Sequence, residues 1–453
     1  MNQTSYQQQM SMLRLTTGYR INSAADDPAG LVAVSALNSD LVAVQAAYDN
    51  GTRANAMLSV ADGAVDEISD LVSDIYSLTV ELANDTGLTE DEKAAKQLEI
   101  DQAIASIDSL VNTTTFNGQH LLNGTYAINT TGVDSSKITD VDITARPVGT
   151  NTSLQLDVVS AAERGQITFS GAGLSHHNSV SLEITGNLGS VQLDFAGSTS
   201  IAEMASAINA NTAATGVQAV ASNNVLYMQS EEYGEDQFVT VHTISGTFHT
   251  TDDVTTDYGE DATVTINGQT ANVDGYDVTF NVNGVTGRLT LAESFVSSSG
   301  GSDSFTVTDG GATFALSPSV SNTATIGISS LSSAHLGNGI VGYLSQITSG
   351  GTYNATDNAT QAMKIAREAV TQVARASANI GAFQSYTITS TQNALSDAET
   401  ALSSAISSIQ DTDYALEMAN LTRQNALYQA QINSLSILSQ QTSSLVNLFS
   451  SLF

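Results

Sequence analysis

The two ends of the chain resemble each other in composition, whereas the middle resembles neither, and this contrast constrains the fold most. Residues up to about Gly124 and from about Asn358 onward are rich in alanine, and their apolar residues recur with a helical period. The stretch between them is rich in Gly, Thr and Val and is typical of strands. Such a chain leaves a helical body and returns to it, so we expect the ends to assemble and the middle to be displayed.

Apolar residues at the two ends follow the three-and-four spacing of helix-packing seams. The N-terminal seam comprises Met57, Ala61, Ala64, Ile68, Leu71, Ile75, Leu78 and Leu82. A further helix is expected to begin at the capping sequence Thr89-Glu90-Asp91-Glu92 and to carry the stripe Ile100, Ile104, Ile107 and Val111. The C-terminal stripes are Met363, Ala366, Val370, Val373 and Ile380 and then, in a shifted phase, Leu395, Ala398, Leu402, Ala405 and Ile409. Taken alone, these stripes predict the core of a helical bundle.

The last apolar stripe of the chain is expected to pack against another molecule. It comprises Leu435, Leu438, Thr442, Leu445, Phe449 and Leu452, and no charged residue follows Arg423. In a monomer this stripe would be an exposed apolar edge. Packing against a helix of another molecule is the simplest way to bury it.

The middle of the chain shows alternation with a period of two, as in 180–184 and 191–195, and one short helix opened by Ser200-Ile201-Ala202-Glu203. The turn sequences Asn267-Gly268, Asn283-Gly284 and Asp309-Gly310 predict hairpins. We therefore expect an α+β protein with discontinuous, coiled-coil-like helical inner domains from both termini and β-rich outer domains inserted between them. The expected division is a helical arm 1–124, β-rich domains 125–240 and 241–345, and a helical arm 346–453.

Charge and cysteine content exclude several classes of protein. The chain carries 46 acidic and 13 basic residues, a formal charge of −33, which argues against nucleic acid and anionic membrane as partners. It has no Cys, so a disulfide framework, thiolate metal sites and a Cys nucleophile are excluded. The N-terminus lacks the pattern of a cleaved secretory signal, and the most apolar segment, 31–47, is interrupted by Asn38-Ser39-Asp40. We expect no membrane span and, if the protein works outside the cell, export by a route other than the general secretory one.

No pattern of catalytic or cofactor chemistry stands out. None of the six His residues begins a His-Glu-x-x-His sequence, and no phosphate-binding or dinucleotide glycine pattern lies between a strand and a helix. The acidic runs 231–236 and 252–257 lack the spacing of a helix-loop-helix calcium site. We expect no enzyme activity, no catalytic residues, no cofactor and no metal site.

One polar segment, 14–30, runs Arg14-Leu15-Thr16-Thr17-Gly18 and then Asn22-Ser23-Ala24-Ala25-Asp26-Asp27-Pro28. It predicts a helix end at Gly18, a connector, and a new helix with Asp27 as N-cap and Pro28 in its first turn. With Phe116-Asn117-Gly118 and Asp411-Thr412-Asp413-Tyr414-Ala415, the segment resembles the terminal signatures of bacterial flagellins. The middle, from about 168 to 241, resembles the inserted repeats of flagellins and hook-associated proteins. The resemblance of the arms covers about half of the chain.

The resemblance implies a subunit of the extracellular flagellar filament for swimming motility, exported unfolded by the type III apparatus without loss of a signal. Its partners would be further copies of itself, the export apparatus, an export chaperone, and cap and junction proteins. It places Arg14, Arg20, Asn22, Asp26 and Asp27 in the connector between two inner layers, as hydrogen-bonding residues. The helical seams would serve assembly through Met57, Ile68, Leu71, Ile75, Leu78, Leu435, Leu438, Leu445, Phe449 and Leu452.

Two alternative functions remain open from the sequence. A hook-filament junction protein shares the arm design but ends assembly after about one ring, and a filament-displayed adhesin would use the β-rich middle. Flagellins also carry a longer segment ahead of the motif that begins here at Arg14, so we expect an incomplete start or a shortened inner layer. Asn-x-Ser/Thr sequences make glycosylation possible at Asn123, Asn129, Asn151, Asn354 and Asn358.

Overall fold

A computed structural model describes residues 2–83, 87–319 and 323–450, and their contacts form two compact units. Unit 1 draws on Met1–Arg53, Ala315–Thr323 and Ile388–Phe453, and unit 2 on Ala54–Phe314 and Ala324–Thr387. Each unit combines segments from both ends of the chain. The expected α+β class, with helical ends and a strand-rich middle, is confirmed.

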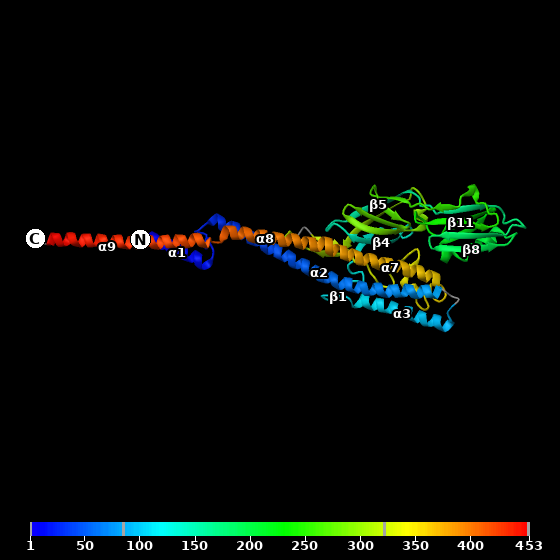
Figure 1. Ribbon diagram of the computed structural model, residues 1–453, viewed down its shortest axis with the longest axis horizontal. Helices are drawn as coiled ribbons and strands as arrows, with labels where there is room; N and C mark the ends of the chain where they lie inside the picture. The colour runs from blue at the N-terminus through cyan, green and yellow to red at the C-terminus, as the bar shows by residue number, and fades with distance from the viewer. Residues whose placement is uncertain (1, 84–86, 320–322, 451–453) are drawn as a thin grey trace. The chain divides into compact units, whose positions relative to one another are not determined.

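Unit 1 is helical. It contains α1 (Asn2–Thr17), the first part of α2 (Pro28–Ala83), most of α8 (Ser390–Gln410) and α9 (Tyr414–Ser450). Helix α1 lies alongside the first part of α9 (Figure 1). Helices α2 and α8 pack through a small apolar cluster of Val44, Ala47 and Leu395. A hydrogen bond of 2.8 Å from Gln45 Nε2 to Glu399 Oε1 flanks this cluster.

Unit 2 contains a helical layer made by the rest of α2, α3 (Glu90–Thr113) and α7 (Ala359–Ala382), which lie side by side (Figure 1). Helix α3 begins with the expected capping box, in which Thr89 accepts from the Glu92 amide and Glu92 accepts from the Thr89 amide. The stripe predicted for this helix is buried, with Ile100, Ile104, Ile107 and Val111 all at most 4% exposed. Lys96 of α3 pairs with Glu81 of α2, and Ser377 of α7 donates to Asp62 of α2 over 3.5 Å.

A π-helical segment, Phe383–Thr389, connects α7 to α8. A π segment takes more residues per turn than an α-helix, so it rotates the apolar stripe about the helix axis. This segment lies where the sequence pattern changes phase between Ile380 and Leu395. The shifted phase of the C-terminal stripes is therefore explained by a local change of helix type.

The first β region of unit 2 consists of two antiparallel sheets. Their strand orders are β14-β13-β5-β18-β3 and β15-β16-β17-β4. The bounds are β3 (Ile128–Thr131), β4 (Ile138–Ala145), β5 (Thr152–Ser160), β13 (Thr263–Ile266), β14 (Gln269–Thr270), β15 (Asn272–Asp274), β16 (Asp277–Val282), β17 (Val285–Leu291) and β18 (Ser302–Gly310). Their inward-facing residues form one apolar core, in which Leu154, Leu156, Val264 and Leu289 are fully buried.

The second β region also has two antiparallel sheets, ordered β6-β10-β9 and β12-β11-β7-β8. The bounds are β6 (Gln166–Ser170), β7 (Val180–Gly186), β8 (Gly189–Phe195), β9 (Val217–Ser222), β10 (Val225–Ser230), β11 (Phe238–Ser245) and β12 (Thr256–Tyr258). Helix α4 (Ile201–Asn209) begins with the expected Ser200–Glu203 capping box and buries Ile201, Met204 and Ile208 against these strands.

The strand pairings divide the middle of the chain differently from the expected blocks 125–240 and 241–345. Strand β5 pairs with β13 and β18, which follow it only after the whole second β region. Strand β11 runs across the expected boundary between residues 240 and 241 and pairs with β7. The second region is thus inserted between β5 and β13 of the first. Local alternation cannot reveal this nesting because it carries no information about which distant strands pair.

Short elements complete unit 2: β1 (Thr115–Phe116), β2 (Gln119–His120), α5 (Thr212–Thr215), α6 (Glu293–Val296), β19 (Ala312–Phe314), β20 (Ala324–Ile326), β21 (Gly337–Asn338), β22 (Gly342–Tyr343) and two 3-10 turns at Thr251–Asp253 and Leu344–Ile347. Asn267-Gly268 and Asn283-Gly284 form the expected tight turns, with positive φ at both residues of each pair. Asp309-Gly310 does not form a hairpin, because β18 continues through it with a register shift before Gly310.

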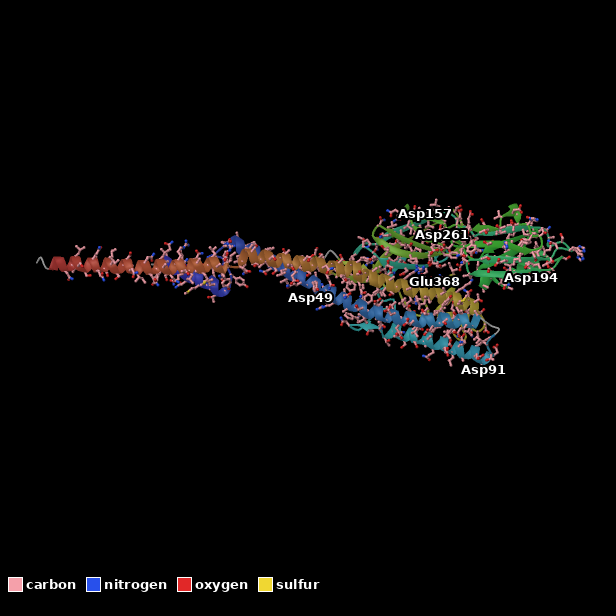
Figure 2. All side chains as sticks on the ribbon, viewed as in Figure 1. Asp49, Asp91, Asp157, Asp194, Asp261 and Glu368 are labelled. Carbon is pink, nitrogen blue, oxygen red and sulfur yellow. The ribbon has the colours of Figure 1, made fainter. Side chains whose placement is uncertain are left out.

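Acidic residues are distributed over many elements, as the labelled Asp49 of α2, Asp91 of α3, Asp157 of β5 and Asp194 of β8 illustrate (Figure 2). Among the described helices, α2 is long and apolar enough to cross a membrane by length and composition alone. A single helix of this kind is weak evidence for a span, and the expected absence of membrane contact stays a prediction.

Candidate assembly surface

Helices α1 and α9 form an antiparallel pair in unit 1 that is held by polar side chains. Thr4 donates to Gln431 Oε1 over 3.2 Å, and Gln8 donates to Asn425 Oδ1 over 2.6 Å. Arg14 lies 4.0 Å from Glu417, which is only 7% exposed. Later residues of α1 pair with earlier residues of α9, so the two helices run in opposite directions. The pairing extends from the start of α9 to about Gln431.

Beyond this pairing, α9 exposes a row of large apolar side chains. Ile432, Leu435, Ile437, Leu438, Leu445 and Val446 are between 42% and 66% exposed. Leu427, Leu435 and Leu438 also line a shallow groove of about 380 Å³. Of the stripe predicted for assembly, Leu435, Leu438 and Leu445 lie in this exposed row. The α9 backbone includes Phe449, whereas Leu452 lies outside the described residues.

The connector 18–27 is held by backbone pairing with the connector that precedes α9. Gly18 ends α1 with φ of +78°, a conformation that favours glycine. The Arg20 amide donates to Gln410 O over 2.6 Å, and the Thr412 amide donates to Gly18 O over 2.8 Å. The Arg20 guanidinium also donates to Ile409 O over 2.6 Å. Arg20 therefore acts through hydrogen bonds within the subunit.

Asp26 and Asp27 shape the entry to α2. Asp26 Oδ2 accepts from the amides of Asn22 and Ser23 over 3.1 and 2.8 Å and from the Ser23 hydroxyl over 3.0 Å. Desolvation opposes ionisation, but these hydrogen bonds outweigh it and lower the pKa of Asp26. Asp27 Oδ1 accepts from the Gly30 amide over 2.9 Å, which confirms it as the N-cap before Pro28.

Much of the N-terminal seam is buried inside the subunit, whereas a role in assembly requires an exposed surface. Met57, Ile68 and Ile75 are at most 7% exposed inside unit 2, and Leu71 and Leu78 are half-buried. A side chain that is buried inside its own subunit cannot also contact a neighbouring one. The first three residues therefore stabilise the helical layer of the subunit, which differs from the role expected for them.

The two helical ends and part of the middle match known family models in chain order. Residues 1–127 match the bacterial flagellin N-terminal helical region, 180–230 the flagellin hook IN motif, and 363–449 the bacterial flagellin C-terminal helical region. The chain belongs to the bacterial flagellin family. The polar connector and the α1–α9 pair fall within the flagellin models that match the two ends.

Curated flagellins are similar to part of this chain. Flagellin A of Helicobacter pylori is 32% identical over 218 residues, which cover 47% of this chain and 41% of that protein. The B-type flagellin of Pseudomonas aeruginosa is 32% identical over 143 residues, which cover 32% and 29%. The chain thus spans less than half the length of these relatives. The match to the solved structure of FliC from Burkholderia pseudomallei covers 73% of this chain and 98% of that chain at 13% identity. Its TM-score is 0.26, which is too low to support a structural argument.

The predicted glycosylation positions of this flagellin lie in unit 2, in loops, in β3 and at the N-cap of α7. Asn123 and Asn354 each accept from the amide and hydroxyl of the residue two positions later, Thr125 and Thr356. Asn129 of β3 donates to Asp309 over 3.0 Å. The two remaining positions, Asn151 and Asn358, are exposed. Glycosylation at these five positions stays a prediction.

Sequence reasoning missed a buried ionic cluster that joins sheet β15-β16-β17-β4 to α7. Arg288 of β17, only 8% exposed, lies 2.7 Å from Asp277 of β16, and Arg375 of α7 lies 3.2 Å from the same Asp277 oxygen. Glu368 of α7 lies 3.8 Å from Arg288 and 3.9 Å from Arg375. Burial raises the pKa of Glu368 and, on β4, that of Asp140. No local spacing signals this cluster, because the β16–β17 hairpin, β4 and α7 that carry its members are far apart in the sequence.

Proposed function

We propose that the chain is the structural subunit of a bacterial flagellar filament and that it polymerises through α9. The exposed apolar row of α9 beyond Gln431 supports this proposal most directly. Complete burial of an exposed Leu, Ile or Val contributes about 1.5–3 kcal/mol, and because these six side chains are only about half exposed, each adds roughly half of that on assembly. The exposed Val32 and Val42 of α2, which are 71% and 64% exposed, offer a second apolar surface in unit 1.

The family supports the partners and the location in this proposal. The chain would assemble with copies of itself outside the cell, after export through the flagellar apparatus with the help of an export chaperone, and would meet cap and junction proteins there. The role is structural, with no catalytic step and no cofactor. Because the subunit carries a formal charge of −33, subunits repel each other and the filament should require salt to screen that repulsion.

The proposal is tested by seeded polymerisation in moderate salt, followed by electron microscopy. Leu438→Asp places a charge at a position that is 62% exposed in the monomer, so the monomer should fold normally and fail to form filaments. Val220→Asp on β9, at a position 48% exposed, is the matched control and should polymerise as the unchanged chain does.

Long filaments from the Leu438→Asp variant would contradict the role of α9. Single rings from the unchanged chain would contradict a filament subunit and favour a junction protein instead.

A further inference from the structure

A cleft of about 270 Å³ in unit 2 lies between α7 and two loops of the β regions. One loop is 232–237, which connects β10 to β11, and the other is the β15–β16 turn at 274–277. Figure 2 labels Glu368 on α7 and Asp261 among the strands, on the two sides of this arrangement. The volume lies just below the usual range of small-molecule sites, about 300–1,000 Å³, so a ligand here must be small.

The β wall of the cleft is built and held in place. Asp261 Oδ1 accepts from the Gly275 amide over 2.9 Å and from the Glu235 amide over 3.4 Å, which joins the two loops. A Cβ on Gly234 would lie 2.6 Å from that same oxygen, so the loops could not approach as closely with any other residue there. Asp236 and Asp274 line the cleft from these two loops.

Among the residues that the structure describes, two carboxylates of this wall lack a direct partner, whereas Asp277 is paired with Arg288 and Arg375. Within the described part of the chain, no hydrogen-bond donor or cation pairs directly with the side chain of Asp236 or Asp274. Burial and the nearby Asp236, Asp261 and Asp277 raise the pKa of Asp274, and Arg375 opposes that shift in part. The β wall therefore presents a negative potential that favours a cation in the cleft.

The opposite wall is a basic face of α7. Lys364, Arg367 and Arg375 line the cleft from this helix, together with the acidic Glu368, which lies near Arg375. Lys364 lies 2.6 Å from Glu231, and Arg375 belongs to the ionic cluster around Asp277. For Arg367, the structure of residues 2–83, 87–319 and 323–450 gives no ion pair and no hydrogen bond of its guanidinium. Arg367 is thus an available bidentate donor for a carboxylate.

Two tyrosines of the β wall add apolar surface beside its carboxylates. The rings of Tyr233 and Tyr276 line the cleft and meet edge to face, with centroids 6.1 Å apart. Arg164 lies 4.3 Å from the centroid of the Tyr233 ring, so the ring surface that Arg164 leaves open is what contacts the methylene groups of a short aliphatic chain.

We propose that this cleft binds a small zwitterion, with its carboxylate on Arg367, its ammonium group between Asp236 and Asp274, and its aliphatic chain on the Tyr233–Tyr276 pair. Unpaired groups of opposite charge on facing walls carry the inference, because a ligand that is only cationic leaves Arg367 unpaired and one that is only anionic meets the acidic wall. The site goes beyond the proposed filament role, since it lies within one subunit.

The test is a titration of the full-length monomer with ω-amino acids from glycine to 6-aminohexanoate, followed by calorimetry and ligand-observed NMR. We expect at least one member of the series to bind, and methylammonium or acetate to bind at least about tenfold more weakly, because each lacks one charge-assisted pair. Asp274→Asn and Arg367→Gln should each weaken binding about tenfold. Asp194→Asn on β8 and Arg53→Gln on α2 make the same charge changes outside the cleft and should leave binding unchanged.

Three results would overturn the proposal: no binding by any member of the series at millimolar concentration, equal binding of methylammonium alone, or binding that survives both cleft variants. Thermal unfolding of each variant confirms that its fold is retained. Because the titration uses monomers, its outcome is independent of whether the chain polymerises.

Discussion

Replacing Arg288 with Met should destabilise the contact between β17 and α7 by about 3 kcal/mol. Arg288 is 8% exposed and donates to Asp277 over 2.7 Å, so Met removes the cation but keeps much of the side-chain volume. Loss of one partner from a buried ion pair costs about 3–5 kcal/mol, because the other charge stays buried. Arg375 remains 3.2 Å from Asp277 and compensates in part, so the lower end of this range applies.

Hydrogen exchange of the β16 and β17 amides in the monomer measures this loss locally, and urea unfolding followed by circular dichroism measures it for the whole subunit. Lys96→Met is the matched control. The side chain of Lys96 is 22% exposed and pairs with Glu81, which is 52% exposed, so its removal should leave stability nearly unchanged. A loss below about 1 kcal/mol for Arg288→Met would refute the view that this cluster stabilises the contact.

Three further predictions concern single positions. Gly30→Ala should destabilise unit 1 by about 1–3 kcal/mol in thermal unfolding, because the added Cβ would lie 2.5 Å from Asp27 Oδ2 and 2.6 Å from Ile21 Cδ1; unchanged stability would contradict the packing. Thr89→Ala should lower the free energy of unfolding by about 1 kcal/mol through loss of the α3 capping box, measured by urea titration, and an effect near zero would count against it. Asp140→Asn should raise stability at pH 7: burial raises the pKa of Asp140 in the folded chain, so its ionisation opposes folding above that pKa, and the gain should shrink as the pH falls from that pKa toward the ordinary pKa of Asp. Urea titrations at pH 7 and pH 4 that show equal gains would refute this sign.

Several helix starts could be predicted because their signals are local. The Thr89–Glu92 and Ser200–Glu203 capping boxes and the Asp27 N-cap lie within a few residues of the groups they bind, and each is present. The exposed row of α9 could be predicted because a stripe without charges recurs with the helical period.

The features that the sequence did not reveal depend on long-range pairing. The nesting of the second β region between β5 and β13 follows from hydrogen bonds between strands that local alternation does not connect. The burial of Ile68 and Ile75 inside the subunit depends on the packing of α2 within unit 2, and a seam in α2 alone does not show whether it packs within or between subunits. The ionic cluster was missed for the same reason, because Glu368 of α7 is far in the sequence from Arg288 and Asp277.

Chemical labelling of a cysteine at position 438 tests most directly whether α9 forms the assembly surface. The natural chain has no cysteine, so Leu438→Cys introduces a single reactive thiol, and Val220→Cys on β9 provides the control. Both positions are exposed in the monomer, at 62% and 48%. We expect both thiols to react with maleimide in monomers, and only the thiol at position 438 to become protected after polymerisation. Equal reactivity of the two thiols in filaments would contradict assembly through α9.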